Sequence, residues 1–238
     1  MQHALRWLLA GLFSLTTAVQ AMTAGSLSAD DYQQIKQTGL DKPQLTHSDI
    51  APLLQLHQHN PLFRFKQLGQ SALGTPIWQI DIGTGPVKVL AWSQMHGDEA
   101  TATAALMDLL NFISADQQQP WRDNWLNKVT LRLIPMVNPD GAAANTRFNS
   151  MGIDINRDAK ALQSPEGRLL MQLARSLQPH YGFNLHDQNR YHAAGDAPNP
   201  ATISLLAPAY NAERDINDSR RRAMQLIAHV KPWLDRQI

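Results

Sequence analysis

The spacing of apolar residues in the first half of the chain predicts two neighbouring strands. Residues 77–82 alternate between apolar and polar side chains, and residues 87–92 form a second, largely apolar run. The residues between them, Gly83-Thr84-Gly85-Pro86, are typical of a turn. We therefore expect a β-hairpin that leads into His96. Further strands are predicted at residues 129–136, 181–185 and 202–206.

Helices are predicted where apolar residues recur every three or four positions. Two amphipathic helices begin near Ser28 and Ser48, and three more begin near Asp98, at Pro165 and near Ala212. Strands that alternate with helices favour an α/β fold in which helices cover a central sheet. The length of 238 residues favours one folded domain.

The first 21 residues have the pattern of an export signal. Arg6 precedes a mostly apolar run, and Val19-Gln20-Ala21 offers the small residues that a signal peptidase reads. An uncleaved membrane anchor is the alternative, but a spanning helix needs about 20 apolar residues and this run is shorter. We expect a signal peptide at 1–21, a helical segment at 22–68 that packs on the catalytic domain, and that domain at 69–238. The protein would be exported, either periplasmic or secreted.

The composition excludes several classes of partner and ligand. Lys and Arg number 21 against 20 Asp and Glu, so no basic surface for nucleic acid is expected. Cysteine is absent, which removes disulfides and thiolate ligands and leaves histidine and carboxylate to hold any metal. We expect a monomer without nucleic acid and without stable membrane association once the signal is cleaved.

The first candidate metal-binding motif is His96-Gly97-Asp98-Glu99, which lies between a predicted strand and a predicted helix. A His and a Glu three residues apart at a helix start can point the same way, and zinc accepts both ligand types. Taken alone, the pair is more typical of an ordinary polar helix cap than of a metal site. His186 stands at the end of another predicted strand, where α/β sheets commonly place functional groups.

Several motifs together resemble the zinc carboxypeptidase family typified by pancreatic carboxypeptidases A and B, and especially its bacterial members. The matching motifs, in chain order, are His96-x-x-Glu99, Asn138-Pro139-Asp140-Gly141, Arg147, Asp154-x-Asn156-Arg157 and His186. The resemblance extends from about Gly69 to about Leu206. It implies a central mixed β-sheet flanked by helices and an exopeptidase that removes C-terminal residues from peptides.

The resemblance also implies a role for each matched residue. His96, Glu99 and His186 would bind one Zn²⁺, with Asp154 hydrogen-bonded to His96 so that its tautomer is fixed.

The remaining matched residues would act on the substrate. Arg147 would stabilise the oxyanion that develops on the scissile carbonyl. Asn156 and Arg157 would bind the free terminal carboxylate of a peptide, since the guanidinium fork matches that group. Without the metal motifs, these polar residues would be read as ion-pair and turn residues.

The sequence departs from the family pattern after His186. The family's catalytic glutamate lies on a strand well downstream of the third ligand, whereas the glutamate that follows here, Glu213, stands at the start of a predicted helix. Glu166 is predicted to be a first-turn residue of its helix, where a negative charge interacts favourably with the helix dipole. We therefore expect a chain that stops before the base and before the last strands of the family's sheet.

Three alternatives remain open at this stage. A related zinc amidase or deacylase could act on cell-wall peptides or acylated amino acids, since both substrates carry a free carboxylate. A non-catalytic domain could bind zinc and peptide without the general base. An exported α/β domain without a metal would make the motifs coincidental.

Overall fold

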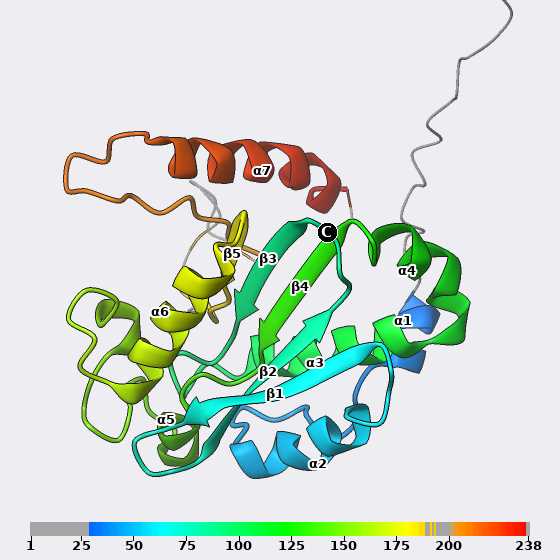
Figure 1. Cartoon of the computed structure of the whole chain (residues 1–238), viewed down its shortest axis with the longest axis horizontal. Helices are drawn as coiled ribbons and strands as arrows, with labels where there is room; N and C mark the ends of the chain where they lie inside the picture. The colour runs from blue at the N-terminus through cyan, green and yellow to red at the C-terminus, as the bar shows by residue number, and fades with distance from the viewer. Residues whose placement is uncertain (1–28, 189–190, 192, 194–200, 202, 237–238) are drawn as a thin grey trace, which may run out of the picture. The chain divides into compact units, whose positions relative to one another are not determined.

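The computed structural model describes residues 29–188, 191, 193, 201 and 203–236 (Figure 1). The predicted signal peptide at 1–21 lies outside the described residues. The chain divides into a first unit of residues 1–34 and a second of residues 35–238, and the sheet and candidate site belong to the second. None of the helices in the described residues is long and apolar enough to cross a membrane.

A mixed five-stranded sheet forms the centre of the second unit (Figure 1). Its strands are β1 (Phe63–Gln70), β2 (Pro76–Ile82), β3 (Val87–Trp92), β4 (Val129–Ile134) and β5 (Tyr181–Asn184). The strand order is β1-β2-β4-β3-β5, with β2 antiparallel to β1 and β4, and with β3 parallel to β4 and β5. The predicted fold class, a mixed sheet flanked by helices, is confirmed.

The predicted hairpin between β2 and β3 is wrong, because β4 lies between these two strands. The 83–86 segment reverses the chain direction, but it does so across the start of β4 rather than in a tight turn between paired strands. There the backbone N–H groups of Thr84 and Gly85 donate to the carbonyls of Leu126 and Val129, at 2.8 and 3.2 Å. A Cβ on Gly85 would come within 1.9 Å of the Lys128 backbone, so this crossing requires glycine. Glycine here serves close approach rather than a hairpin.

Three other expectations are corrected. Residues 63–68, placed in a helical segment, belong to β1, whose first four side chains alternate between more buried and exposed positions. No strand forms over the described residues 203–206, and the last helix begins at Asp218 rather than near Ala212. The Asn217 side chain accepts from the Arg220 N–H and sets that start.

The helices are α1 (Ala29–Ile35), α2 (His47–His57), α3 (Thr101–Ser114), α4 (Gln119–Trp125), α5 (Pro139–Ala144), α6 (Pro165–Leu177) and α7 (Asp218–Leu234). Short 3₁₀ turns occur at Asp116–Gln118 and Ile155–Arg157.

Both faces of the sheet carry a hydrophobic core. On one face, Ile80 and Leu133 of the strands pack in a cluster with Leu54 of α2 and Leu110 of α3. The other core cluster joins strand residues to α6; its members include Ile77, Leu90, Ile134, Leu173 and Leu177. These two layers fix the sheet, and the loops at the carboxyl ends of β3 and β5 then carry the candidate ligands.

Candidate metal site

The loop after β3 is held by a buried side chain. Gln94 is fully buried, with a left-handed backbone at φ 49°, and its Nε2 donates to the Leu45 carbonyl at 2.7 Å and to the Gly97 carbonyl at 2.9 Å. Its Oε1 accepts from the Thr103 hydroxyl at 2.8 Å. Both the nitrogen and the oxygen of the Gln94 side-chain amide are hydrogen-bonded. These bonds hold the loop that carries His96 in one conformation.

The backbone of the His96–Glu99 motif packs directly against that of the Asn138–Gly141 motif. A Cβ on Gly97 would lie 2.0 Å from the carbonyl carbon of Gly141. The Asn138 side chain accepts from the Gly141 N–H at 2.9 Å and caps α5. The Asn138–Gly141 motif therefore supports the loop that carries His96.

His96, Glu99 and His186 come together as a potential ligand set. The Glu99 carboxylate lies between the two imidazoles, with Oε1 2.6 Å from His96 Nδ1 and Oε2 2.6 Å from His186 Nδ1. One ligand atom from each residue fits within 4.8 Å of the others. Two imidazole nitrogens and a carboxylate oxygen are the donor set of many catalytic zinc sites, so these residues fit the ion.

Burial and charge differ across the three residues. The His96 side chain is 3% exposed and that of His186 is 29% exposed, so the cluster opens to solvent on the His186 side. Burial raises the pKa of Glu99, but hydrogen bonds from His186 and His96 outweigh it and lower that pKa to about 2. The carboxylate is therefore anionic at neutral pH, as a metal ligand must be.

Asp154 lies behind His96, on the ring nitrogen that faces away from Glu99. Its Oδ1 is 3.2 Å from His96 Nε2, and its Oδ2 accepts from Arg147 Nε at 3.0 Å. Burial raises the pKa of Asp154, but the hydrogen bond and charge of Arg147, followed by His96, lower it overall. An anionic acceptor on Nε2 favours the tautomer that leaves Nδ1 directed at the cluster.

Arg147 lies at the edge of the cluster itself. Its Nη1 is 3.1 Å from His96 Nδ1 and 3.9 Å from Glu99 Oε1, while Asp154 holds the rest of the guanidinium. A positive charge held by Asp154 therefore lies beside the potential ligand set.

Asn156 and Arg157 occupy the 3₁₀ turn that follows Asp154. Asn156 is half-buried, and its Oδ1 accepts from Asn184 Nδ2 at 3.1 Å, which links the turn to β5. Arg157 is exposed, and its Nη1 makes one long hydrogen bond of 3.4 Å to the Asn156 carbonyl. The structure thus ties Asn156 to the strand that carries His186, and directs Arg157 to solvent.

Sequence reasoning missed three residues that support this site: Thr101, Asn184 and Asp187. Asp187 Oδ2 accepts from the Thr101 hydroxyl at 2.8 Å and from the Thr101 N–H at 3.2 Å. The available signal was a carboxylate directly after His186, but its partner is 86 residues away in the chain. Local spacing carries no information about such a pair.

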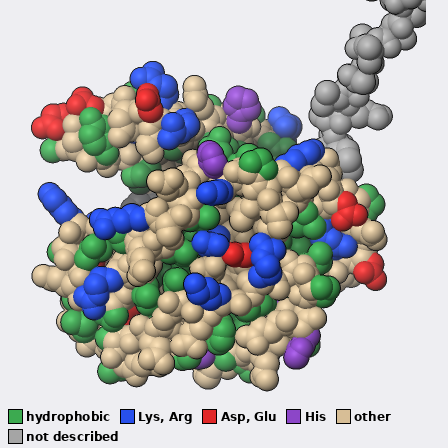
Figure 2. Space-filling view, viewed as in Figure 1, with side chains coloured by type: hydrophobic (Ala, Val, Ile, Leu, Met, Phe, Trp, Pro, Cys, Tyr) green, Lys and Arg blue, Asp and Glu red, His purple; other side chains and the backbone are tan. Residues whose placement is uncertain are grey.

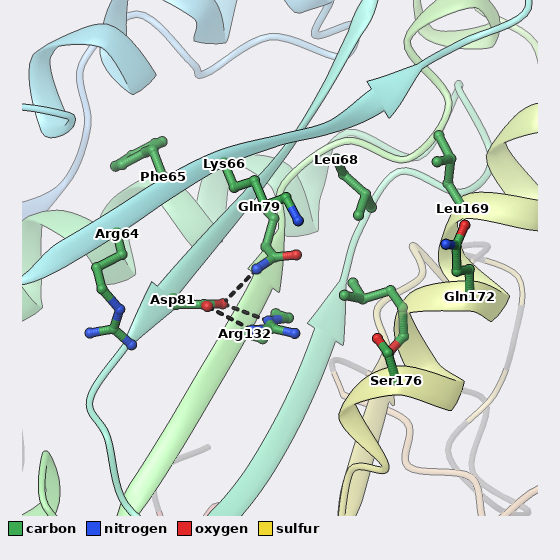
Figure 3. Close-up of a pocket in the computed structure, with 11 residues that line it drawn as sticks. Arg64, Phe65, Lys66, Leu68, Gln79, Asp81, Arg132, Leu169, Gln172 and Ser176 are labelled. Atoms are coloured by element: carbon green, nitrogen blue, oxygen red, sulfur yellow. Dashed lines mark hydrogen bonds and ion pairs between the residues drawn. The ribbon is translucent and has the colours of Figure 1, made fainter.

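A separate pocket of about 440 Å³ lies between the strands and α6, and none of the candidate ligands lines it (Figure 3). Asp81 there binds Arg132 through two hydrogen bonds of 2.6 and 2.7 Å, and Arg64 donates to the Gly83 carbonyl. Lys and Arg side chains gather on this face of the molecule (Figure 2). Charges that pair across adjacent strands are typical of a solvated sheet face, so we assign no chemistry to this pocket.

The family can now be identified from comparison with known proteins. The sequence profile described as zinc carboxypeptidase matches residues 52–170, half of the chain. The chain belongs to the zinc carboxypeptidase family. The matched region contains His96 and Glu99, and the cofactor that this family implies is Zn²⁺.

The relatives of this chain include a carboxypeptidase and an endopeptidase. Carboxypeptidase SOL1 of Arabidopsis thaliana is 24% identical over 205 residues, which cover 72% of this chain and 41% of the relative. Gamma-D-glutamyl-L-diamino acid endopeptidase 1 of Lysinibacillus sphaericus is 33% identical over 87 residues, 34% of this chain and 22% of the relative.

Solved structures show the same fold. The metallo-carboxypeptidase from Burkholderia cenocepacia superimposes with a TM-score of 0.57 at 23% identity, over 61% of this chain and 42% of that one. The chain thus spans about two fifths of the length of this structure and of the Arabidopsis relative.

Proposed function

We propose that this protein is a zinc-dependent exopeptidase that hydrolyses the C-terminal peptide bond of peptides. The observation that carries the proposal is the Glu99 carboxylate, ionised and placed 2.6 Å from Nδ1 of both His96 and His186. When bound there, Zn²⁺ would activate a water molecule and polarise the scissile carbonyl. Asp154 would hold His96 in the ligating orientation from behind.

Arg147 is proposed as the residue that stabilises the developing oxyanion. Its guanidinium is held by Asp154 and stands within 3.9 Å of Glu99, so it needs no rearrangement to face a carbonyl brought to the cluster. A preorganised donor at such a position contributes about 3 kcal/mol to transition-state stabilisation.

Asn156 and Arg157 are proposed to bind the terminal carboxylate of the substrate. The exposed Arg157 side chain retains donors for a ligand, and a planar guanidinium can bind both carboxylate oxygens. Asn156 is fixed by Asn184, so its amide would set the distance between the carboxylate and the metal ligands.

A zinc-activated water would also need a proton acceptor. Glu166 is fully buried and its carboxylate accepts from the Ala72 N–H at 2.9 Å and from Asn149 Nδ2 at 3.0 Å, so it serves the fold. Glu213 is exposed and does not match the family motif. A second candidate is a domain that binds zinc and peptide without turnover.

The third candidate is an amidase that acts on cell-wall peptides. It is supported by the gamma-D-glutamyl-L-diamino acid endopeptidase of L. sphaericus among the relatives. The pattern at residues 1–21 supports export, periplasmic or secreted, which suits either a nutrient-peptide or a wall-peptide substrate. We also propose that the protein acts as a monomer.

Zinc content and substrate choice test these candidates in order. Purified protein should carry one Zn²⁺ per chain, as should the control His229→Ala on α7, whereas His96→Ala should carry none. Equal and negligible zinc in all three would refute the metal site.

Hydrolysis is then compared on a peptide and on its C-terminal amide. Cleavage of the free peptide alone would show that the reaction requires the free carboxylate, and cleavage of both would support a broader amidase action. Stoichiometric zinc without cleavage of either would support the binding domain.

A further inference from the structure

Asp187 joins the third candidate ligand to the helix that follows the first two. Thr101 is the first residue of α3, and the residue before it, Ala100, has no side chain that can cap the helix. Asp187 supplies the missing acceptor, with Oδ2 2.8 Å from the Thr101 hydroxyl and 3.2 Å from the Thr101 N–H. The cap of α3 therefore comes from the residue next to His186.

The backbone of the same residue contacts the ligand set directly. The Asp187 N–H donates to Glu99 Oε2 at 3.3 Å, and His186 Nδ1 lies 2.6 Å from that oxygen. Three contacts thus join the two segments. The His186 ring and the Asp187 N–H contact Glu99, and the Asp187 carboxylate binds Thr101.

Apart from these contacts and the His96 ring, whose centroid lies 4.7 Å from that of His186, the His186 side chain has little support. It follows β5, a strand of four residues that is largely exposed and pairs with β3. The backbone bond nearest to His186 on its N-terminal side is from the Leu185 N–H to the Trp92 carbonyl, at 3.0 Å. A ligand on so lightly packed a segment must be ordered when the metal binds, and that ordering reduces affinity unless another contact has already fixed it.

The second oxygen of Asp187 indicates that the residue is more than a helix cap. Oδ1 is buried and has no hydrogen-bond partner among the described residues. A buried acceptor without a partner lowers the stability of the folded state. Capping of α3 alone therefore does not explain why residue 187 is an aspartate.

We propose that Asp187 is a positioning residue for the metal site. By binding Thr101, it holds His186 against Glu99 before the metal arrives, and so raises the affinity for Zn²⁺. This inference rests on the proposed function, because it assumes that His96, Glu99 and His186 bind zinc.

The test is a titration of the full-length chain with Zn²⁺ against a competing chelator. We expect Asp187→Ala to lower zinc affinity by about 10- to 100-fold, the range found when a group that orients a metal ligand is removed. Asp187→Asn, which keeps an acceptor for Thr101, should retain most of the affinity. Thr101→Val should lose part of it and Thr101→Ser should restore it.

The matched control is Asn217→Ala, which removes the cap of α7 and leaves the metal cluster intact. Thermal unfolding of each metal-free variant separates lost stability from lost affinity. If Asp187→Ala unfolds more easily but binds zinc as the wild type does, Asp187 is a cap alone and the inference is overturned. Should Asp187→Ala not fold, wild-type affinity in Thr101→Val would overturn it equally. A wild-type chain that binds no zinc overturns the proposed function, and the inference with it, in the first titration.

Discussion

Single residues set the geometry of this site through close backbone approach and through charge. Gly97 lies between two candidate ligands and its Cα faces the Gly141 backbone, so the smallest side chain is required there. Arg147 illustrates the second effect, since its guanidinium touches Asp154 and approaches Glu99 without being a potential ligand. Substitutions at the two positions should therefore have different consequences.

Replacing Gly97 by alanine should damage both the fold and the metal site. The new Cβ would come within 2.0 Å of the Gly141 carbonyl carbon, and backbone on both sides would have to move. We expect a loss of about 1–3 kcal/mol in the free energy of unfolding, measured by urea titration, together with weaker zinc binding. Gly182→Ala is the control, because its Cβ would meet Trp92 at an ordinary 3.7 Å. Equal stability of the two variants would contradict the prediction.

Replacing Arg147 by methionine should separate catalysis from metal binding. The variant loses the proposed oxyanion donor but keeps all three ligands, so kcat/KM on a cleaved peptide should fall about 100-fold. Zinc content should remain one per chain, since removing a nearby positive charge does not oppose a cation. A variant that lost its zinc would show that Arg147 supports the ligands instead.

At the scale of elements, buried polar contacts decide where helices begin. Asp158 accepts from the Ser164 hydroxyl at 2.7 Å and from the backbone N–H groups of Gln163 and Ser164 at 2.7 and 2.8 Å. Ser164 in turn accepts from the Gly167 N–H and caps α6. Burial raises the pKa of Asp158, but these hydrogen bonds and the charge of Arg168 lower it overall.

A lowered pKa in the folded state makes this contact a source of acid sensitivity. Its contribution is fully present above the ordinary aspartate pKa near 4 and is lost as pH falls through the lower, folded value. Asp158→Asn should therefore reduce stability at pH 7 by about 1–3 kcal/mol and weaken the pH dependence below pH 4, as followed by urea unfolding. Asp235→Asn breaks an exposed pair with Lys231 and should change little. If both variants kept the wild-type acid transition, Asp158 would not be its source.

At the scale of the whole molecule, the proposed metal connects segments that are far apart in the chain. His96 and Glu99 follow β3, whereas His186 follows β5, and both strands lie in one sheet. An ion bound to all three would stabilise the folded chain, because the unfolded chain does not hold these ligands together.

Removing the metal should lower the thermal stability of the protein. At free zinc 1,000 times the dissociation constant, binding contributes about 4 kcal/mol, which for a chain of this size corresponds to a shift in Tm of roughly 10 °C. A chelator should produce that decrease in the wild type and in His229→Ala but not in His186→Ala. The same decrease in His186→Ala would show that the stabilising metal binds elsewhere.

Local patterns in the sequence were sufficient to locate most of the elements and to single out the candidate ligands. Each of these features is marked by residues close together in the chain. Examples are the apolar run of β3, the proline at the start of α6 and the His-x-x-Glu motif. These signals arise because side-chain periodicity and capping are short-range properties of the backbone.

The tertiary structure alone decided which segments became neighbours. It placed β4 between β2 and β3, packed Gly97 on Gly141, and brought Asp187 to Thr101. Strand pairing and backbone contacts of this kind depend on how the whole core is filled, so they leave no mark on the spacing of nearby residues. The candidate ligands could therefore be selected from the sequence, whereas the contacts that hold them in place could not.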